Sequence, residues 1–174
     1  PNAILQLLPV LDRTLGRAGR DRLLLGIDLP PDDAGMWPEA HCRAAHLAVW
    51  QGCTEAAAIL TEAGQGTADY ILAHRIPGPA KALIRALPAP LGARLLTAAI
   101  AKHAWTFTGS GRFRVTSRRP LTFKITDNPL AFPGCACPWH AAVFQRLFQV
   151  LVWPAARVEG TTTDTVSTFL IHPR

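Results

Sequence analysis

Aromatic and cationic side chains alternate in one short stretch of the chain, WTFTGSGRFRV. Trp105, Phe107 and Phe113 offer flat apolar rings, whereas Arg112 and Arg114 offer guanidinium groups that pair with carboxylates. A groove of such rings with cations at its rim fits a flat, apolar and anionic ligand. A tetrapyrrole has this chemistry, because its macrocycle stacks on aromatic rings and its propionates pair with guanidinium groups.

Two histidines are candidate axial ligands for the magnesium ion at the centre of such a macrocycle. His103 comes just before the aromatic stretch, and His140 lies in the amphipathic segment PWHAAVFQRLFQVLVW beside Trp139. A single histidine is more often a structural or surface residue, so the choice between the two stays open. The predicted ligand-binding residues are Trp105, Phe107, Arg112, Phe113, Arg114, Trp139 and Phe144, with His103 or His140 on the metal; no catalytic residue is predicted.

Common catalytic and cofactor motifs are absent from the sequence. It contains no GxGxxG after a strand, no GxxxxGK[ST], no HExxH and no GxSxG. The segment Gly109-Ser110-Gly111 is expected to be a hairpin turn rather than a phosphate loop. Cys135-Ala136-Cys137 is CxC without a second pair, so zinc is not expected. Nucleic-acid binding is not expected either, because no stacking motif is recognisable.

The charge distribution favours an anionic partner. The chain has 174 residues and a net charge of +6, and ten Lys or Arg but no acidic residue lie between Asp69 and Asp127. An anionic small molecule, a membrane surface and nucleic acid all fit this positive field, and a solvated helical surface is the simpler alternative.

Four cysteines do not make a disulfide framework in a chain of this size, so free thiols and a cytoplasmic location are expected. No signal peptide or membrane-spanning stretch is found.

Hydrophobic periodicity predicts an α+β fold in a single domain, residues 1–174. A helical layer is expected over residues 1–104, and a β-β-α-β-β part over 105–174, with an antiparallel sheet of about four strands. The expected helices are 2–15 with a break at Pro9, 38–64 ending at Gly64, 68–76 capped by Thr67, 80–87, one from 91, and 138–153. A strand is expected to begin at Trp105 and reverse at Gly109-Ser110-Gly111, and further strands are expected at 111–116, 121–125, 157–161 and 166–172.

Three segments resemble the 4-vinyl-reductase domain family of bacteriochlorophyll biosynthesis proteins. They are TADYILAHRIP, AIAKHAWTFTGSGRF and CPWHAAVFQRLFQVLV, and the similarity extends to PNAILQLLPVL at the start. The resemblance implies a role in bacteriochlorophyll synthesis at the magnesium-porphyrin or divinyl chlorophyllide stage. It also implies a fold like that of the TRAPP vesicle-tethering subunits, which often dimerise, and so leaves a homodimer open.

The name of the family that the chain resembles describes a reductase, yet the sequence contains no nicotinamide, flavin or iron-sulfur motif. The prediction is therefore a non-enzymatic carrier that binds Mg-protoporphyrin IX or divinyl (proto)chlorophyllide and delivers it to pathway enzymes, at the inner face of the photosynthetic membrane. An 8-vinyl reductase is the first alternative, and a scaffold that docks on the membrane or on pathway enzymes is the second. The tail VEGTTTDTVSTFLI carries Thr and Ser where family members carry cysteines, which also disfavours zinc.

Overall fold

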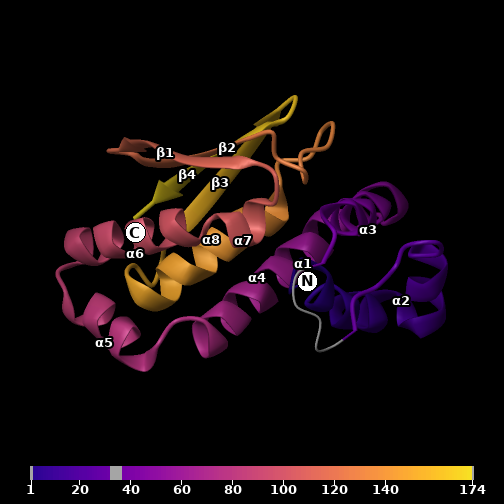
Figure 1. Ribbon diagram of the computed structural model, residues 1–174, viewed down its shortest axis with the longest axis horizontal. Helices are drawn as coiled ribbons and strands as arrows, with labels where there is room; N and C mark the ends of the chain where they lie inside the picture. The colour runs from indigo at the N-terminus through magenta and orange to yellow at the C-terminus, as the bar shows by residue number, and fades with distance from the viewer. Residues whose placement is uncertain (1, 32–36, 174) are drawn as a thin grey trace.

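The strongest amphipathic segment of the chain forms the central helix, α8 (Pro138–Leu151). In the computed structural model, which describes residues 2–31 and 37–173, α8 lies between the sheet and α4 (Ala56–His74) (Figure 1). Phe144 is fully buried, and its ring centroid lies 5.2 Å from those of Phe123 and Phe169 on the sheet. The predicted helix is confirmed, and its apolar side is the centre of the core.

Two antiparallel hairpins on either side of α8 in the sequence build one four-stranded sheet. The strands are β1 (Arg112–Arg118), β2 (Leu121–Thr126), β3 (Arg157–Thr163) and β4 (Val166–His172), in the spatial order β1-β2-β4-β3. The predicted pairing of the first two strands is confirmed, with Phe113 opposite Ile125 and Arg114 opposite Lys124. Helices cover one face of this sheet (Figure 1), so the α+β class and the β-β-α-β-β order are confirmed.

In the part of the chain that the structure describes, seven helices precede the sheet: α1 (Asn2–Leu5), α2 (Leu8–Leu23), α3 (Glu39–Gly52), α4, α5 (Gly78–Ala86), α6 (Ala89–His103) and α7 (Trp105–Thr108). Helices α1 to α3 gather at one end, and α4 runs from them beneath α8 towards α5 (Figure 1). The predicted break near Pro9 separates α1 from α2, and α2 itself is kinked at Gly16, where φ is 70°. No helix within residues 2–31 and 37–173 is long and apolar enough to cross a bilayer.

The prediction that a helix ends at Gly64 is wrong, because α3 ends at Gly52 and α4 continues through Gly64. A Cβ at Gly64 would collide with the backbone carbonyl of Trp139 and lie 2.9 Å from the Cβ of Ala142. The glycine therefore lets α4 approach α8 closely. Thr67 does not cap a new helix, because its hydroxyl donates to the carbonyl oxygen of Ala63 at 2.9 Å.

The prediction of a strand from Trp105 to a reversal at Gly109-Ser110-Gly111 is also wrong. Residues 105–108 form the helical turn α7, in which the Thr108 hydroxyl donates to the Ala104 carbonyl oxygen at 3.0 Å. Gly109 has a φ of 57°, which ends the turn, and the Gly-Ser-Gly segment leads into β1. Four residues are too few for the sequence to separate a two-residue from a 3.6-residue period.

Candidate functional site

The predicted site residues fall into three separate places. Four of them lie in or at the edge of the core between α8 and the sheet: Phe107, Phe113, His140 and Phe144. Trp139 is buried in the same core on α8, with its ring centroid 5.7 Å from that of His46 on α3. Trp105 and His103 lie on the surface where α6 meets α7. Arg112 and Arg114 are exposed on β1, on the sheet face opposite the helices.

The phenylalanines of the predicted groove pack on one another. The Phe107 ring centroid lies 6.2 Å from that of Phe113 and 5.7 Å from that of Phe144, with edge-to-face angles. Phe113 also lies 5.1 Å from Phe123 on the neighbouring strand. These rings fill the space between α8 and the sheet, so a macrocycle would have to part the two layers to stack on them. Phe107 and Phe113 are only half-buried and form the outer edge of the cluster.

His140 is completely buried, and hydrogen bonds engage both of its ring nitrogens. Nε2 lies 3.0 Å from the carbonyl oxygen of Phe107, which can only accept, so Nε2 carries the proton. Nδ1 lies 2.9 Å from Sγ of Cys137 and accepts the thiol proton. Burial lowers the pKa of His140 to about 4, so the ring is neutral near pH 7.

A chain of polar side chains continues from His140 to the far hairpin. The Asn128 amide nitrogen donates to Sγ of Cys137 at 3.4 Å and to Oγ of Ser167 at 2.8 Å, and Ser167 contacts Oγ1 of Thr162 at 3.0 Å. Burial raises the pKa of the Cys137 thiol to about 12, which keeps it protonated. The protonated thiol is a poor nucleophile and a poor metal ligand, and internal hydrogen bonds occupy both ring nitrogens of His140. The network therefore holds the 128–137 loop on α8 and β4.

His103 and Trp105 lie at the surface, where α6 ends and α7 begins. His103 is the last residue of α6 and is exposed, and the Trp105 side chain at the start of α7 is 60% exposed. An indole and an imidazole are thus exposed within three residues of the sequence, on helices that contact the edge strand β1. We call the residues His103, Trp105, Phe107 and Phe113 the α7–β1 corner.

The exposed sheet face next to this corner is cationic. Arg112 pairs with Asp127, with 2.8 Å between Nη2 and Oδ2, whereas no ion pair involves Arg114 within the described part of the chain. Arg114 stands directly opposite Lys124 across β1 and β2. Two like charges in this position repel each other, so an anion between them is stabilising.

Glu39 is a residue whose role the sequence did not indicate. Its carboxylate accepts hydrogen bonds from the backbone N–H of Ser110 and, at 2.8 Å, from the Ser110 hydroxyl. The first turn of α3 therefore fixes the segment that joins α7 to β1, and a Cβ at Gly109 would collide with Glu39. Nothing local signals this contact, because the two residues lie 71 positions apart.

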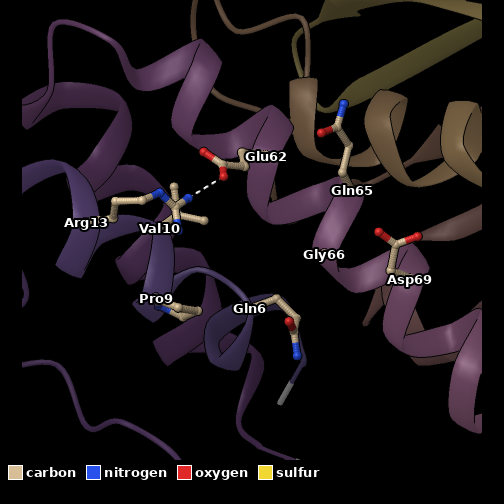
Figure 2. Close-up of a pocket in the computed structure, with 8 residues that line it drawn as sticks. All are labelled: Gln6, Pro9, Val10, Arg13, Glu62, Gln65, Gly66 and Asp69. Atoms are coloured by element: carbon tan, nitrogen blue, oxygen red, sulfur yellow. Dashed lines mark hydrogen bonds and ion pairs between the residues drawn. The ribbon is translucent and has the colours of Figure 1, made fainter.

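A pocket of about 270 Å³ lies between α2 and α4, away from every predicted site residue. Figure 2 shows Arg13 and Glu62 pointing towards each other across it, joined by an ion pair. Its lining is mostly polar and suits water or a small polar molecule better than an apolar macrocycle: Gln6, Pro9, Val10, Arg13, Glu62, Gln65, Gly66 and Asp69. Over residues 2–31 and 37–173, no three His, Cys, Asp or Glu side chains cluster as a metal site requires.

Two curated proteins are similar to the chain over most of its length, and no family model matches it. The bacteriochlorophyll synthase 23 kDa chain of Rhodobacter capsulatus is 58% identical, covering 100% of this chain and 86% of that protein. The protein of the same name from Cereibacter sphaeroides is 52% identical, covering 92% and 82%.

The fold is also similar to a solved structure, the Fe(II) unliganded H-NOX protein of K. algicida. The superposition has a TM-score of 0.65 with 11% identity and covers 99% of this chain and 95% of that one. A point mutant of the same protein superposes with a TM-score of 0.64 and 12% identity. At this identity the likeness concerns the fold, and it agrees with the mixed α+β architecture.

Proposed function

This chain belongs to the family of the bacteriochlorophyll synthase 23 kDa chain, and from that membership we propose that it binds a magnesium tetrapyrrole of the pathway and carries it to pathway enzymes. A role in bacteriochlorophyll biosynthesis follows from identities of 52% and 58% with two such chains. The intermediates proposed are Mg-protoporphyrin IX and divinyl (proto)chlorophyllide. Association with the bacteriochlorophyll synthase complex is part of the proposal, as the relatives' name suggests.

The observation that carries the proposal is the α7–β1 corner with its neighbouring cations. Trp105 offers an exposed ring on which a macrocycle can stack, and Phe107 and Phe113, on α7 and on the adjoining strand β1, are only partly buried. Arg114 on β1 and Lys124 on β2 lie on the opposite face of the sheet, and we propose that the carboxylates of the same ligand bind them around the edge strand β1. A ligand at the β1 edge of the sheet would therefore contact both the aromatic rings and the cations, although these lie on opposite faces of the sheet.

Of the two candidate axial ligands, His103 is favoured over His140. An axial ligand offers a ring nitrogen with a free lone pair to the metal. Both ring nitrogens of His140 are within 3.0 Å of internal partners, and its ring is fully buried among Phe107, Trp139 and Phe144. His103 is exposed at the end of α6, so coordination there needs no change in the core.

Titration with Mg-protoporphyrin tests the proposal through the Soret band of the pigment. We expect a saturable shift of the Soret band in the wild type. In His103→Ala the affinity for the pigment is expected to be at least about tenfold weaker, because this variant loses the axial bond to magnesium. His74→Ala is the matched control, since His74 is also an exposed histidine at the end of a helix, α4. Binding no tighter than about 1 mM in the wild type, or equal affinity in all three proteins, would contradict the proposal.

Charge reversal on β1 tests where the carboxylates bind. Arg112→Glu with Arg114→Glu is expected to weaken pigment binding about tenfold or more, with little loss of stability because both side chains point to solvent. Arg157→Glu, an exposed arginine on the opposite edge strand β3, is the control. Unchanged pigment affinity in the folded double variant would show that the carboxylates bind elsewhere.

The remaining finer assignments belong to the same proposal. They are membership of the 4-vinyl-reductase domain family, a TRAPP-subunit-like fold with a homodimer left open, and a cytoplasmic location with peripheral contact at the photosynthetic membrane. Incubation of the pure protein with a divinyl chlorophyllide and a reductant distinguishes a carrier from an 8-vinyl reductase. A carrier returns the divinyl pigment unchanged, whereas turnover would establish the enzyme.

A further inference from the structure

Exposed large apolar side chains of this protein concentrate on α5 to α7. Six such residues are exposed in the described part of the chain, and four of them lie there: Leu83, Leu91, Leu95 and Trp105, with exposed fractions of 54%, 47%, 39% and 60%. A cluster of this kind on a soluble surface marks a contact with a partner.

One face of α6 carries most of this cluster together with cations. Leu91, Leu95 and Lys102 follow the spacing i, i+4 and i+11, which places them on one side of the helix, and Trp105 follows Lys102 by three residues. Arg94 flanks the same side, and the opposite side, with Leu96 and Ile100, is buried. We call Leu91, Arg94, Leu95, Lys102 and Trp105 the α6 face.

The positive charge of the α6 face favours an anionic partner. No acidic residue occurs between Asp69 and Asp127, and no ion pair involves Arg94 or Lys102 within the described ranges. A second copy docked on the same face would bring two sets of unpaired cations together, which disfavours a symmetric dimer through it. An anionic partner would neutralise them.

We infer that the α6 face docks on the surface of an anionic lipid bilayer. Leucine side chains at the boundary of the acyl chains, a tryptophan at headgroup level and cations among lipid phosphates are the features of a helix lying in a membrane interface. The inference specifies the residues and lipid chemistry of the membrane contact proposed above. It does not depend on pigment binding.

Sedimentation with vesicles of phosphatidylcholine containing one quarter phosphatidylglycerol tests this docking on the pigment-free protein. We expect binding to these vesicles but not to pure phosphatidylcholine, and loss of binding at high salt. Arg94→Glu with Lys102→Glu is expected to weaken binding at least about tenfold, since each cation near the surface contributes about fivefold. Arg17→Glu with Arg22→Glu changes the net charge equally on the exposed side of α2 and is expected to retain most of the binding.

Leucine substitutions test the apolar part of the α6 face. Leu91→Gln with Leu95→Gln is expected to weaken binding about tenfold, whereas Leu25→Gln, an 85% exposed leucine near α2, is expected to leave it unchanged. Trp105 stays intact, because the proposed pigment site includes it. Equal binding to both kinds of vesicle, equal loss in both charge pairs, or a changed oligomeric state in place of vesicle binding would overturn the inference. None of these outcomes bears on the Soret titration, because no pigment is present.

Discussion

Replacing Gly64 by alanine is expected to lower the free energy of unfolding by about 2 kcal/mol or more, although alanine is the better helix former. The added Cβ would collide with the Trp139 carbonyl oxygen and meet the Ala142 Cβ at 2.9 Å. The collision involves backbone, which cannot rotate away, so α4 and α8 have to move apart. Separation of these helices also loosens the layer that supports Phe144 and His140.

Gly66→Ala on the same helix is the matched control. The nearest atom to a Cβ at Gly66 is the side-chain oxygen of Gln6 at 3.4 Å, so alanine fits there. We expect this variant to gain about 0.5–1 kcal/mol, because glycine in a helix costs conformational entropy. Urea unfolding of the two variants gives the comparison, and equal stability of both would mean that α4 and α8 are not in close contact in solution.

Strong hydrophobic periodicity was sufficient to predict the sheet and α8. Leu121, Phe123 and Ile125 alternate with polar residues, and the helix after Pro138 has a continuous apolar stripe, so each element has one clear buried side. The same alternation predicted that Arg112 and Arg114 lie on the face opposite Phe113, and the structure agrees.

The errors arose where tertiary contacts decide the local structure. Gly64 was expected to end a helix because glycine often does, but its contact with α8 lies 75 or more residues away in the sequence. The turn after Ala104 depends on a threonine hydroxyl and on Glu39, which lies far upstream. A single sequence does not show such pairs.

The candidate site was predictable in residue type more than in arrangement. Arg112 and Arg114 lie on β1, and Phe107 and Phe144 pack against Phe113 of that strand, but the aromatic alternation did not reveal that α8 covers one side of β1. Phe107 and Phe113 therefore pack on Phe144 rather than line an open groove. His140 was a candidate ligand from its place beside Trp139, whereas its partners Cys137 and Phe107 could be seen only in the fold.

Acidification from pH 6.5 to 4 is expected to remove about 6 kcal/mol of unfolding free energy through two buried histidines, about 3 kcal/mol each. Burial lowers the pKa of both His46 and His140 from 6.5 to about 4. His46 is fully buried and donates from Nε2 to the Ala3 carbonyl oxygen at 3.0 Å. The unfolded chain takes up protons below pH 6.5 while the folded protein does not, so this stability is present above pH 6.5 and is lost as the pH falls towards 4.

Denaturant unfolding at a series of pH values measures the effect as a slope. Two histidines give a slope of about 2 to 3 kcal/mol per pH unit in this window, and His46→Gln or His140→Gln is expected to halve it. His74→Gln, at an exposed position on α4, is the control for the exchange of a histidine for glutamine. A wild-type slope retained in His140→Gln would mean that the His140 ring is open to protons in the folded state. Only such an opening would make His140 available to a ligand, so the slope also tests the preference for His103 as the axial residue.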